Sequence, residues 1–125
     1  MITRRKEPFR YSMEEPLECQ MELTAINQMA VDGKLATIEL IDISKNGCKI
    51  RSPLNLHASE NTIECRIHLR LNVEAFVFPG EVRWQRDWDG VNHYYGIQLL
   101  LNDVEKEKIS IELRSLAAER KIKVM

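Results

Sequence analysis

The chain has 125 residues, of which 18 are lysine or arginine, 19 are aspartate or glutamate, and 44% are hydrophobic. This length predicts a single domain, residues 1–125, whose core needs no disulfide framework or structural metal. The formal net charge of -1 argues against a DNA-coating protein, and the longest apolar run, residues 75–78, is far shorter than the ~20 residues that cross a bilayer. We therefore expect a soluble, cytoplasmic protein that neither inserts into membranes nor binds DNA or RNA.

A basic arm is predicted at the N-terminus. Residues 1–13 show neither helical nor strand periodicity, and a proline interrupts them. The first ten residues carry Arg4, Arg5, Lys6 and Arg10 against one glutamate, a local charge of +3, so the other 115 residues sum to -4. We expect this arm to be flexible and to place a cationic cluster beside the folded domain.

Residues 14–101 have the periodicity of strands. In residues 63–71, five apolar residues alternate with glutamate, arginine and histidine, so the apolar side chains share one face of a pleated strand. Shorter alternating runs occur at residues 36–40, 81–85 and 95–99. Turns with a positive φ are predicted at Asp32-Gly33, Asn46-Gly47 and Asp89-Gly90. Short strands at this spacing predict a mainly β fold, a small antiparallel barrel of about six strands.

The phase of each run predicts which aromatic side chains are buried. Trp84 shares the apolar phase of Val82 and is predicted to lie in the core. Trp88 lies in a turn region, where it is either a partner contact or a lid over a ligand. Tyr94 and Tyr95 lie on opposite faces of one strand, so only one of them can belong to the core.

After residue 101 the apolar period changes to that of a helix. Asn102 and Glu105 form a candidate capping box, and the apolar residues Ile109, Leu113 and Leu116 then recur on one stripe. The sequence therefore predicts a C-terminal helix within residues 102–125.

Motifs for catalysis and metal binding are missing from the sequence. The cysteines, Cys19, Cys48 and Cys65, are widely spaced without a CxxC pair, and the last two fall on apolar strand faces, which predicts buried thiols. The sequence contains no Gly-rich phosphate loop, HExxH or GxSxG motif, and its three histidines are scattered. We expect a protein without catalytic activity, metal or cofactor.

Two segments together form a candidate site for a guanine nucleotide. The arm offers Arg5, Lys6 and Arg10, and residues 42–47 (DISKNG) lie where an apolar strand runs into a turn. Guanine presents two acceptors, O6 and N7, that match an arginine fork, and two donors that a carboxylate such as that of Asp42 accepts. Phosphates attract arginine and lysine. The arm and the turn thus supply groups for both the base and the phosphates.

These segments resemble the motifs of the PilZ domain family, whose members bind the bacterial second messenger cyclic di-GMP. The matched residues are Asp42, Ser44 and Gly47 in the (D/N)xSxxG motif, and Arg5, Lys6 and Arg10 in the RRxxxR motif. A late segment, residues 96–99, is similar to the family's G-(V/I)-x-(F/L) pattern. The likeness covers the whole chain and implies a stand-alone PilZ domain.

The resemblance implies a role for each matched residue. Arg5 and Arg10 grip phosphates and guanine, and Asp42 accepts from the guanine donors. Ser44 and Gly47 form the rim that meets the base and the ribose-phosphate.

Two positions of the arm bear on affinity and stoichiometry. Arg4 lies where the family sets whether one nucleotide or a stacked pair is bound. Lys6 keeps the charge of the usual arginine but lacks its planar fork, and one lost charge-assisted contact is worth about 1 to 3 kcal/mol. We therefore expect affinity about tenfold to a hundredfold below that of an all-arginine motif.

The leading hypothesis is a non-catalytic cyclic di-GMP receptor, a monomer or weak dimer, which signals to an unidentified effector protein by ordering of residues 1–13. A first alternative is a degenerate PilZ adaptor that binds a partner protein without nucleotide. Lys6 favours this alternative, and the intact second motif opposes it. A second alternative is an OB-like barrel for single-stranded nucleic acid, which the charge of -4 outside the arm and the 6% aromatic content oppose.

Overall fold

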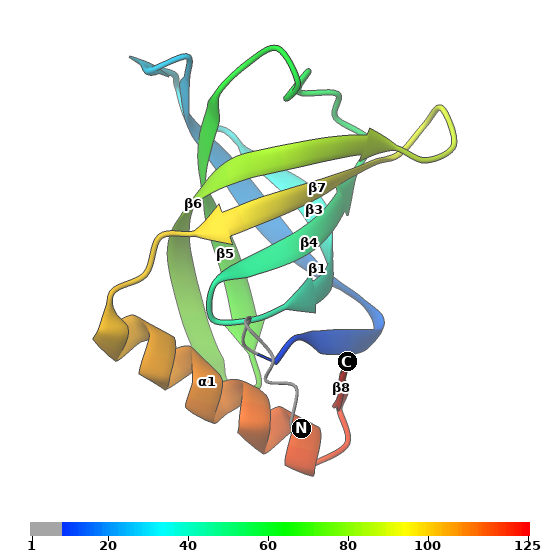
Figure 1. The fold of residues 1–125 in the computed structure, drawn as a ribbon, viewed down its shortest axis with the longest axis vertical. Helices are drawn as coiled ribbons and strands as arrows, with labels where there is room; N and C mark the ends of the chain where they lie inside the picture. The colour runs from blue at the N-terminus through cyan, green and yellow to red at the C-terminus, as the bar shows by residue number, and fades with distance from the viewer. Residues whose placement is uncertain (1–8) are drawn as a thin grey trace, which may run out of the picture.

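Six antiparallel strands form a closed barrel in the computed structural model, which describes residues 9–125 (Figure 1). They are β1 (Tyr11–Ile26), β3 (Leu35–Ile43), β4 (Gly47–Ser52), β5 (Ile63–Leu71), β6 (Glu74–Asp87) and β7 (His93–Leu99). Neighbours follow the order β1-β3-β4-β7-β6-β5, and pairing of β1 with β5 closes the barrel. The predicted fold class is therefore confirmed.

The interior of the barrel holds the apolar residues that the alternation predicted. In β5 every second residue, from Ile63 to Leu71, is buried. Tyr95 is fully buried and Tyr94 only half-buried, which confirms that one of the two belongs to the core. All three cysteines are buried free thiols, as their positions on apolar faces predicted for Cys48 and Cys65.

Helix α1 (Asp103–Ala118) lies across one end of the barrel (Figure 1). Its capping box is confirmed, because the Asn102 side chain accepts from the Glu105 amide at 2.8 Å and the Glu105 carboxylate accepts from the Asn102 amide at 3.1 Å. Ile109, Leu113 and Leu116 bury the inner stripe of the helix. Burial of each such side chain stabilises the fold by roughly 1.5–3 kcal/mol. Within the described residues, no helix has the length and hydrophobicity needed to span a membrane.

The predicted arm is three residues too long. Tyr11, Ser12 and Met13 already belong to β1, where they pair with a short C-terminal strand, β8 (Ile122–Val124). The sequence did not indicate this pairing because its two partners are short and stand at opposite ends of the chain. Residues 1–8, with Arg4, Arg5 and Lys6, lie outside the described residues, so the flexibility predicted for the arm is not tested there.

The predicted turns are correct at one glycine of three. Gly90 has a φ of 77°, whereas Gly33 and Gly47 do not adopt a positive φ. The turn from β1 to β2 (Met29–Ala30) instead places Asn27 and Gln28 at positive φ, which shows that polar residues take this role here.

The prediction for Trp84 is wrong, because its side chain is 42% exposed. Val82 pairs with Ile97 and Trp84 pairs with Gly96, so Arg83 is an extra residue that forms a β-bulge. A bulge reverses the inward and outward phase of the residues that follow it. Trp84 therefore lies on the outer surface of the barrel, over Gly96.

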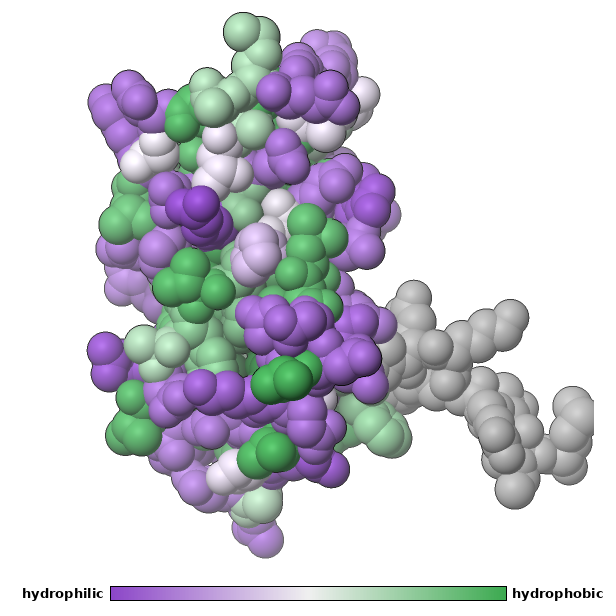
Figure 2. All heavy atoms as spheres, turned by 90° about the vertical axis from the view of Figure 1, so that its left-hand side faces the viewer, coloured by the Kyte–Doolittle hydropathy of each residue, from purple (hydrophilic) through white to green (hydrophobic). Residues whose placement is uncertain are grey.

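The outer surface also carries single apolar side chains among charged ones. Figure 2 shows one side of the molecule, on which hydrophobic residues reach the surface between hydrophilic ones. Val77 of β6 and Leu100, which leads to α1, are 51% and 47% exposed. Isolated apolar residues of this kind are common on folded proteins and need no partner to explain them.

Candidate functional site

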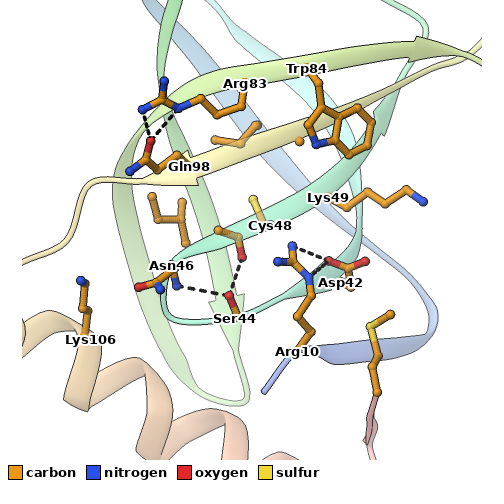
Figure 3. Close-up of a pocket in the computed structure, with 15 residues that line it drawn as sticks. Arg10, Asp42, Ser44, Asn46, Cys48, Lys49, Arg83, Trp84, Gln98 and Lys106 are labelled. Carbon is orange, nitrogen blue, oxygen red and sulfur yellow. Dashed lines mark hydrogen bonds and ion pairs between the residues drawn. The ribbon is translucent and has the colours of Figure 1, made fainter. Parts of the chain in front are cut away.

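A cleft of about 720 Å³ opens on the outside of the barrel, beside the end of β3 and over β4 and β7 (Figure 3). Its volume lies in the range of roughly 300–1,000 Å³ that is typical of small-molecule sites. It brings together all four of the predicted site residues that the structure describes, Arg10, Asp42, Ser44 and Gly47. Arg4, Arg5 and Lys6 lie outside the described residues.

An ion pair joins Arg10, which directly precedes β1, to Asp42 near the end of β3. Nε and Nη2 of Arg10 lie 3.1 and 2.9 Å from Oδ1 of Asp42. The Asp42 side chain is 9% exposed and that of Arg10 is 34% exposed, so the carboxylate lies at the bottom and the guanidinium at the surface. The backbone of Arg10 is also held, because its carbonyl accepts from the Met125 amide at 2.8 Å. Both the side chain and the backbone of Arg10 are thus held in place.

The turn between β3 and β4, which we call the turn edge (residues 44–47), is closed by its own hydrogen bonds. The Ser44 amide donates to the Gly47 carbonyl at 2.8 Å, and the Ser44 hydroxyl accepts from the Asn46 amide at 3.2 Å. The Asn46 carbonyl accepts from the Leu99 amide at 2.9 Å, which ties the turn to β7. Ser44 is fully buried. Its hydroxyl therefore shapes the turn.

Two glycines that line the cleft allow close contacts within the protein. A Cβ atom on Gly47 would lie 2.7 Å from the carbonyl oxygen of Ile97, closer than a real contact permits. A Cβ atom on Gly96 would lie 1.9 Å from the indole nitrogen of Trp84. Gly47 is therefore required by the close approach of β7, and Gly96 by the indole that lies on it. The space over both glycines is therefore filled by the protein itself.

Among the described residues, cationic side chains outnumber carboxylates around the cleft. Arg10, Lys49, Arg83 and Lys106 line it together with Asp42 and the C-terminal residue Met125, and Glu81 lies 3.7 Å from Arg83. Nε of Arg83 donates to Oε1 of Gln98 at 2.6 Å. The cleft can therefore hold an anion that also carries planar, hydrogen-bonding groups.

Sequence reasoning missed several of these residues. Lys49, Arg83 and Lys106 come from β4, β6 and α1, and only the tertiary fold brings them to one cleft. Trp84 was placed in the core because the bulge has no clear sequence signal. One signal was available for Lys49, which stands two residues after Gly47 and so shares its outward phase.

The described residues offer no second centre for chemistry in this region. Cys48 lines the cleft, but burial raises the pKa of its thiol above the ordinary value, and burial raises the pKa of Cys65 to about 12. Such thiols stay protonated near neutral pH and are poor nucleophiles. Among residues 9–125, no three His, Cys, Asp or Glu side chains are grouped so that they could hold a metal ion.

Comparisons with known proteins support one family. No curated protein matches the chain. The family model of the PilZ domain matches residues 3–114, nearly the whole chain. This family binds cyclic di-GMP, and its members are generally receptors without catalytic activity. With this match and the barrel that carries the motif residues on one cleft, the chain belongs to the PilZ domain family.

Proposed function

We propose that this protein is a non-catalytic receptor that binds cyclic di-GMP in the cleft and relays its presence to a separate protein. The observation that carries the proposal is the convergence of Arg10 with Asp42, Ser44 and Gly47. Arg10 and Asp42 are 32 positions apart in the sequence, yet their side chains form a direct ion pair. This convergence joins the two halves that a guanine nucleotide requires.

In the ion pair, Arg10 and Asp42 lie close enough together to contact the same guanine base. Both contacts from Arg10 go to the same oxygen of Asp42, Oδ1, so the guanidinium does not occupy Oδ2. In the proposed complex Asp42 accepts from N1-H and N2-H of guanine, and Arg10 turns its fork to a phosphate or to the O6 and N7 edge. The half-exposed guanidinium makes this exchange possible without unfolding the turn edge.

The rest of the cleft suits the phosphates and a flat base. Lys49, Arg83 and Lys106 supply positive charge for the two phosphodiesters of the ligand. Trp84 lines the cleft, where its indole is proposed to stack on a purine. Bases at aromatic faces of this kind contribute roughly 1–3 kcal/mol each.

The relay is proposed to use the arm. The bond from Met125 to the Arg10 carbonyl and the pairing of Tyr11 with Val124 fix the chain at residues 10 and 11. Arg4, Arg5 and Lys6 precede this anchor and are proposed to close over the bound nucleotide, with Lys6 lowering the affinity. Ordering of the arm then changes the surface that an effector protein meets.

Calorimetric titration with cyclic di-GMP tests the proposal. We expect saturable binding by the wild-type protein, loss of binding in Arg10→Ala and Asp42→Ala, and weak binding in Arg10→Lys, which keeps the charge and loses the fork. GTP is the ligand control. Arg66→Ala is the matched variant, because Arg66 is an exposed arginine on β5 that pairs with Glu22 at 3.4 Å, outside the cleft.

The titration also decides between the receptor and an adaptor. The adaptor alternative is favoured by Lys6 and by the fact that Arg10 and Asp42 already satisfy one another in this structure. Absence of heat, together with a melting temperature that excess cyclic di-GMP leaves unchanged, refutes the receptor and supports an adaptor that binds its partner without nucleotide.

A further inference from the structure

The barrel carries a cationic and aromatic surface that continues outward from the cleft. We call it the hairpin face. It is formed on β4, β6, β7 and the loop between β6 and β7 by Lys49, Arg51, Trp84, Arg86, Trp88 and Tyr94. We propose that the hairpin face docks an acidic segment of a partner protein, and that nucleotide in the cleft weakens this docking. The second half of the proposal rests on the proposed function, whereas the first does not.

Strand pairing places these side chains in two adjacent rows. Tyr94 of β7 pairs with Arg51 of β4 on one side and with Arg86 of β6 on the other. Two residues along, Gly96 pairs with Lys49 and with Trp84 in the same way. Residues two apart on a strand share a face, so the two rows form one continuous outer surface.

Contacts among these side chains hold the surface in place. Nζ of Lys49 lies 4.9 Å from the centroid of the Tyr94 ring, and the rings of Trp88 and Tyr94 meet edge to face with centroids 5.6 Å apart. The guanidinium of Arg86 lies 5.8 Å from the ring of Trp84. Groups that are ordered before binding lose less freedom when a partner docks.

The tip of the hairpin exposes large apolar side chains to solvent. The side chain of Trp88 is 69% exposed, and Val91 at the tip of the same hairpin is 65% exposed. Tryptophan, tyrosine and arginine are the residues that most often carry the binding energy of protein interfaces. Their clustering at one exposed hairpin therefore favours a protein partner.

The charge of the hairpin face selects an acidic partner. Lys49, Arg51 and Arg86 are its cations. Two carboxylates lie beside them: Glu39 is bonded to Arg51 at 2.9 to 3.0 Å, and Asp89 at the hairpin tip accepts from the Val91 and Asn92 amides. Asp87 pairs with His93, whose side chain is buried, so its carboxylate lies on the opposite side of the hairpin. The surface thus keeps a positive excess, which an acidic segment with an apolar anchor complements.

The cleft and the hairpin face share Lys49 and Trp84. A bound cyclic dinucleotide engages both side chains and adds two negative charges next to the surface. Both effects oppose an acidic partner. Because the coupling between two binding sites is reciprocal, the partner weakens nucleotide binding by the same factor.

A display library of random twelve-residue peptides is the probe for the first half. The library is selected on the purified full chain, and the most enriched peptide is synthesised and titrated by fluorescence anisotropy. We expect enriched peptides rich in Asp and Glu around an aromatic residue. Arg86→Glu and Trp88→Ala should each raise the dissociation constant about tenfold or more, as for hot-spot residues. Arg66→Glu and Leu35→Ala are matched exposed controls and should leave it unchanged.

The remaining outcomes separate the two halves. Basic or neutral peptides, or an affinity that Arg86→Glu leaves unchanged, overturn the docking surface. So does oligothymidylate that binds at moderate salt and competes with the peptide, because the surface is then a nucleic-acid site. Saturating cyclic di-GMP should weaken peptide binding severalfold, and no change while cyclic di-GMP itself binds overturns the coupling. Peptide binding without any cyclic di-GMP binding upholds the docking surface and refutes the receptor function.

Discussion

The turn edge and the hairpin face border the same cleft, but different forces hold them. The turn edge is closed by backbone hydrogen bonds and by the buried hydroxyl of Ser44. The hairpin face is held by contacts among exposed rings and cations, such as that of Lys49 with Tyr94. The first cannot change shape without breaking buried bonds, whereas a single contact of the second can be lost without disturbing the backbone. We infer that the turn edge fixes where a ligand sits and that the hairpin face adjusts how tightly it is held.

The largest effect is expected at the turn edge, for Gly47→Ala. The added Cβ atom would lie 2.7 Å from the backbone oxygen of Ile97, and neither strand can yield without breaking the tie between Asn46 and Leu99. We expect a loss of about 1–3 kcal/mol in the free energy of unfolding, typical of overpacking, together with loss of cyclic di-GMP binding. Urea unfolding and calorimetry measure the two losses. A stable Gly47→Ala variant that still binds would show that the turn edge is not rigid.

A smaller effect, confined to binding, is expected for Trp84→Ala on the hairpin face. Trp84 is 42% exposed and contributes little to the core, but it lines the cleft, where we propose that it stacks on a base. We expect cyclic di-GMP affinity to fall about tenfold, within the range of one lost stacking contact, with nearly unchanged stability. Trp84→Phe should recover part of the affinity. Equal affinities for Trp84→Ala and the wild type would exclude stacking at this position.

The features that we predicted correctly depend on residues that are close together in the sequence. The alternation of β5 and the capping box of α1 depend on neighbours within a few positions, so both were correct. Asp42, Ser44 and Gly47 form one short segment, and a motif identified them as a group. Their meeting with Arg10 agrees with the resemblance, but the role of each residue in binding stays a prediction.

Features that depend on contacts between distant segments were not predicted. The bulge at Arg83 placed Trp84 outside the core, and nothing in the alternation of residues 81–85 signals an extra residue. The pairing of β8 with Tyr11 joins the two ends of the chain. Lys106 reaches the cleft only because α1 begins beside it. These features come from the tertiary fold, which periodicity does not encode.

Gly96→Ala tests whether the hairpin face yields where the turn edge does not. The added Cβ atom would collide with the indole of Trp84, an exposed side chain that can swing away, and not with backbone. We therefore expect a loss of at most about 1 kcal/mol in the free energy of unfolding, as for surface positions. In a Trp88→Phe background, the Trp84 emission should shift to the red. A loss in the free energy of unfolding as large as that of Gly47→Ala would show that the hairpin face is as rigid as the turn edge.

The smallest effect concerns the inner side of the hairpin and depends on pH. The carboxylate of Asp87 lies 2.5 Å from Nδ1 of His93, and this hydrogen bond, with a second from Gln85, lowers the pKa of Asp87 below its ordinary value of 3.8. A carboxyl whose pKa is lowered in the folded state stabilises the fold above its unfolded pKa, and this contribution is lost as the pH falls through the folded pKa.

Asp87→Asn should therefore lower stability slightly at about pH 6, and the difference from the wild type should shrink toward zero as the pH falls below 3.8 and through the lowered pKa of Asp87. Urea unfolding of both proteins across this range measures it, with Asp32→Asn as an exposed control. Because the Asp87 side chain is 67% exposed, solvent screens the pair and the effect stays small. A difference that persists unchanged at low pH would mean that Asp87 holds the hairpin through hydrogen bonds that survive protonation. The stability of the hairpin would then depend on the hydrogen bonds of Asp87 and His93, and the charge of the Asp87 carboxylate would contribute nothing.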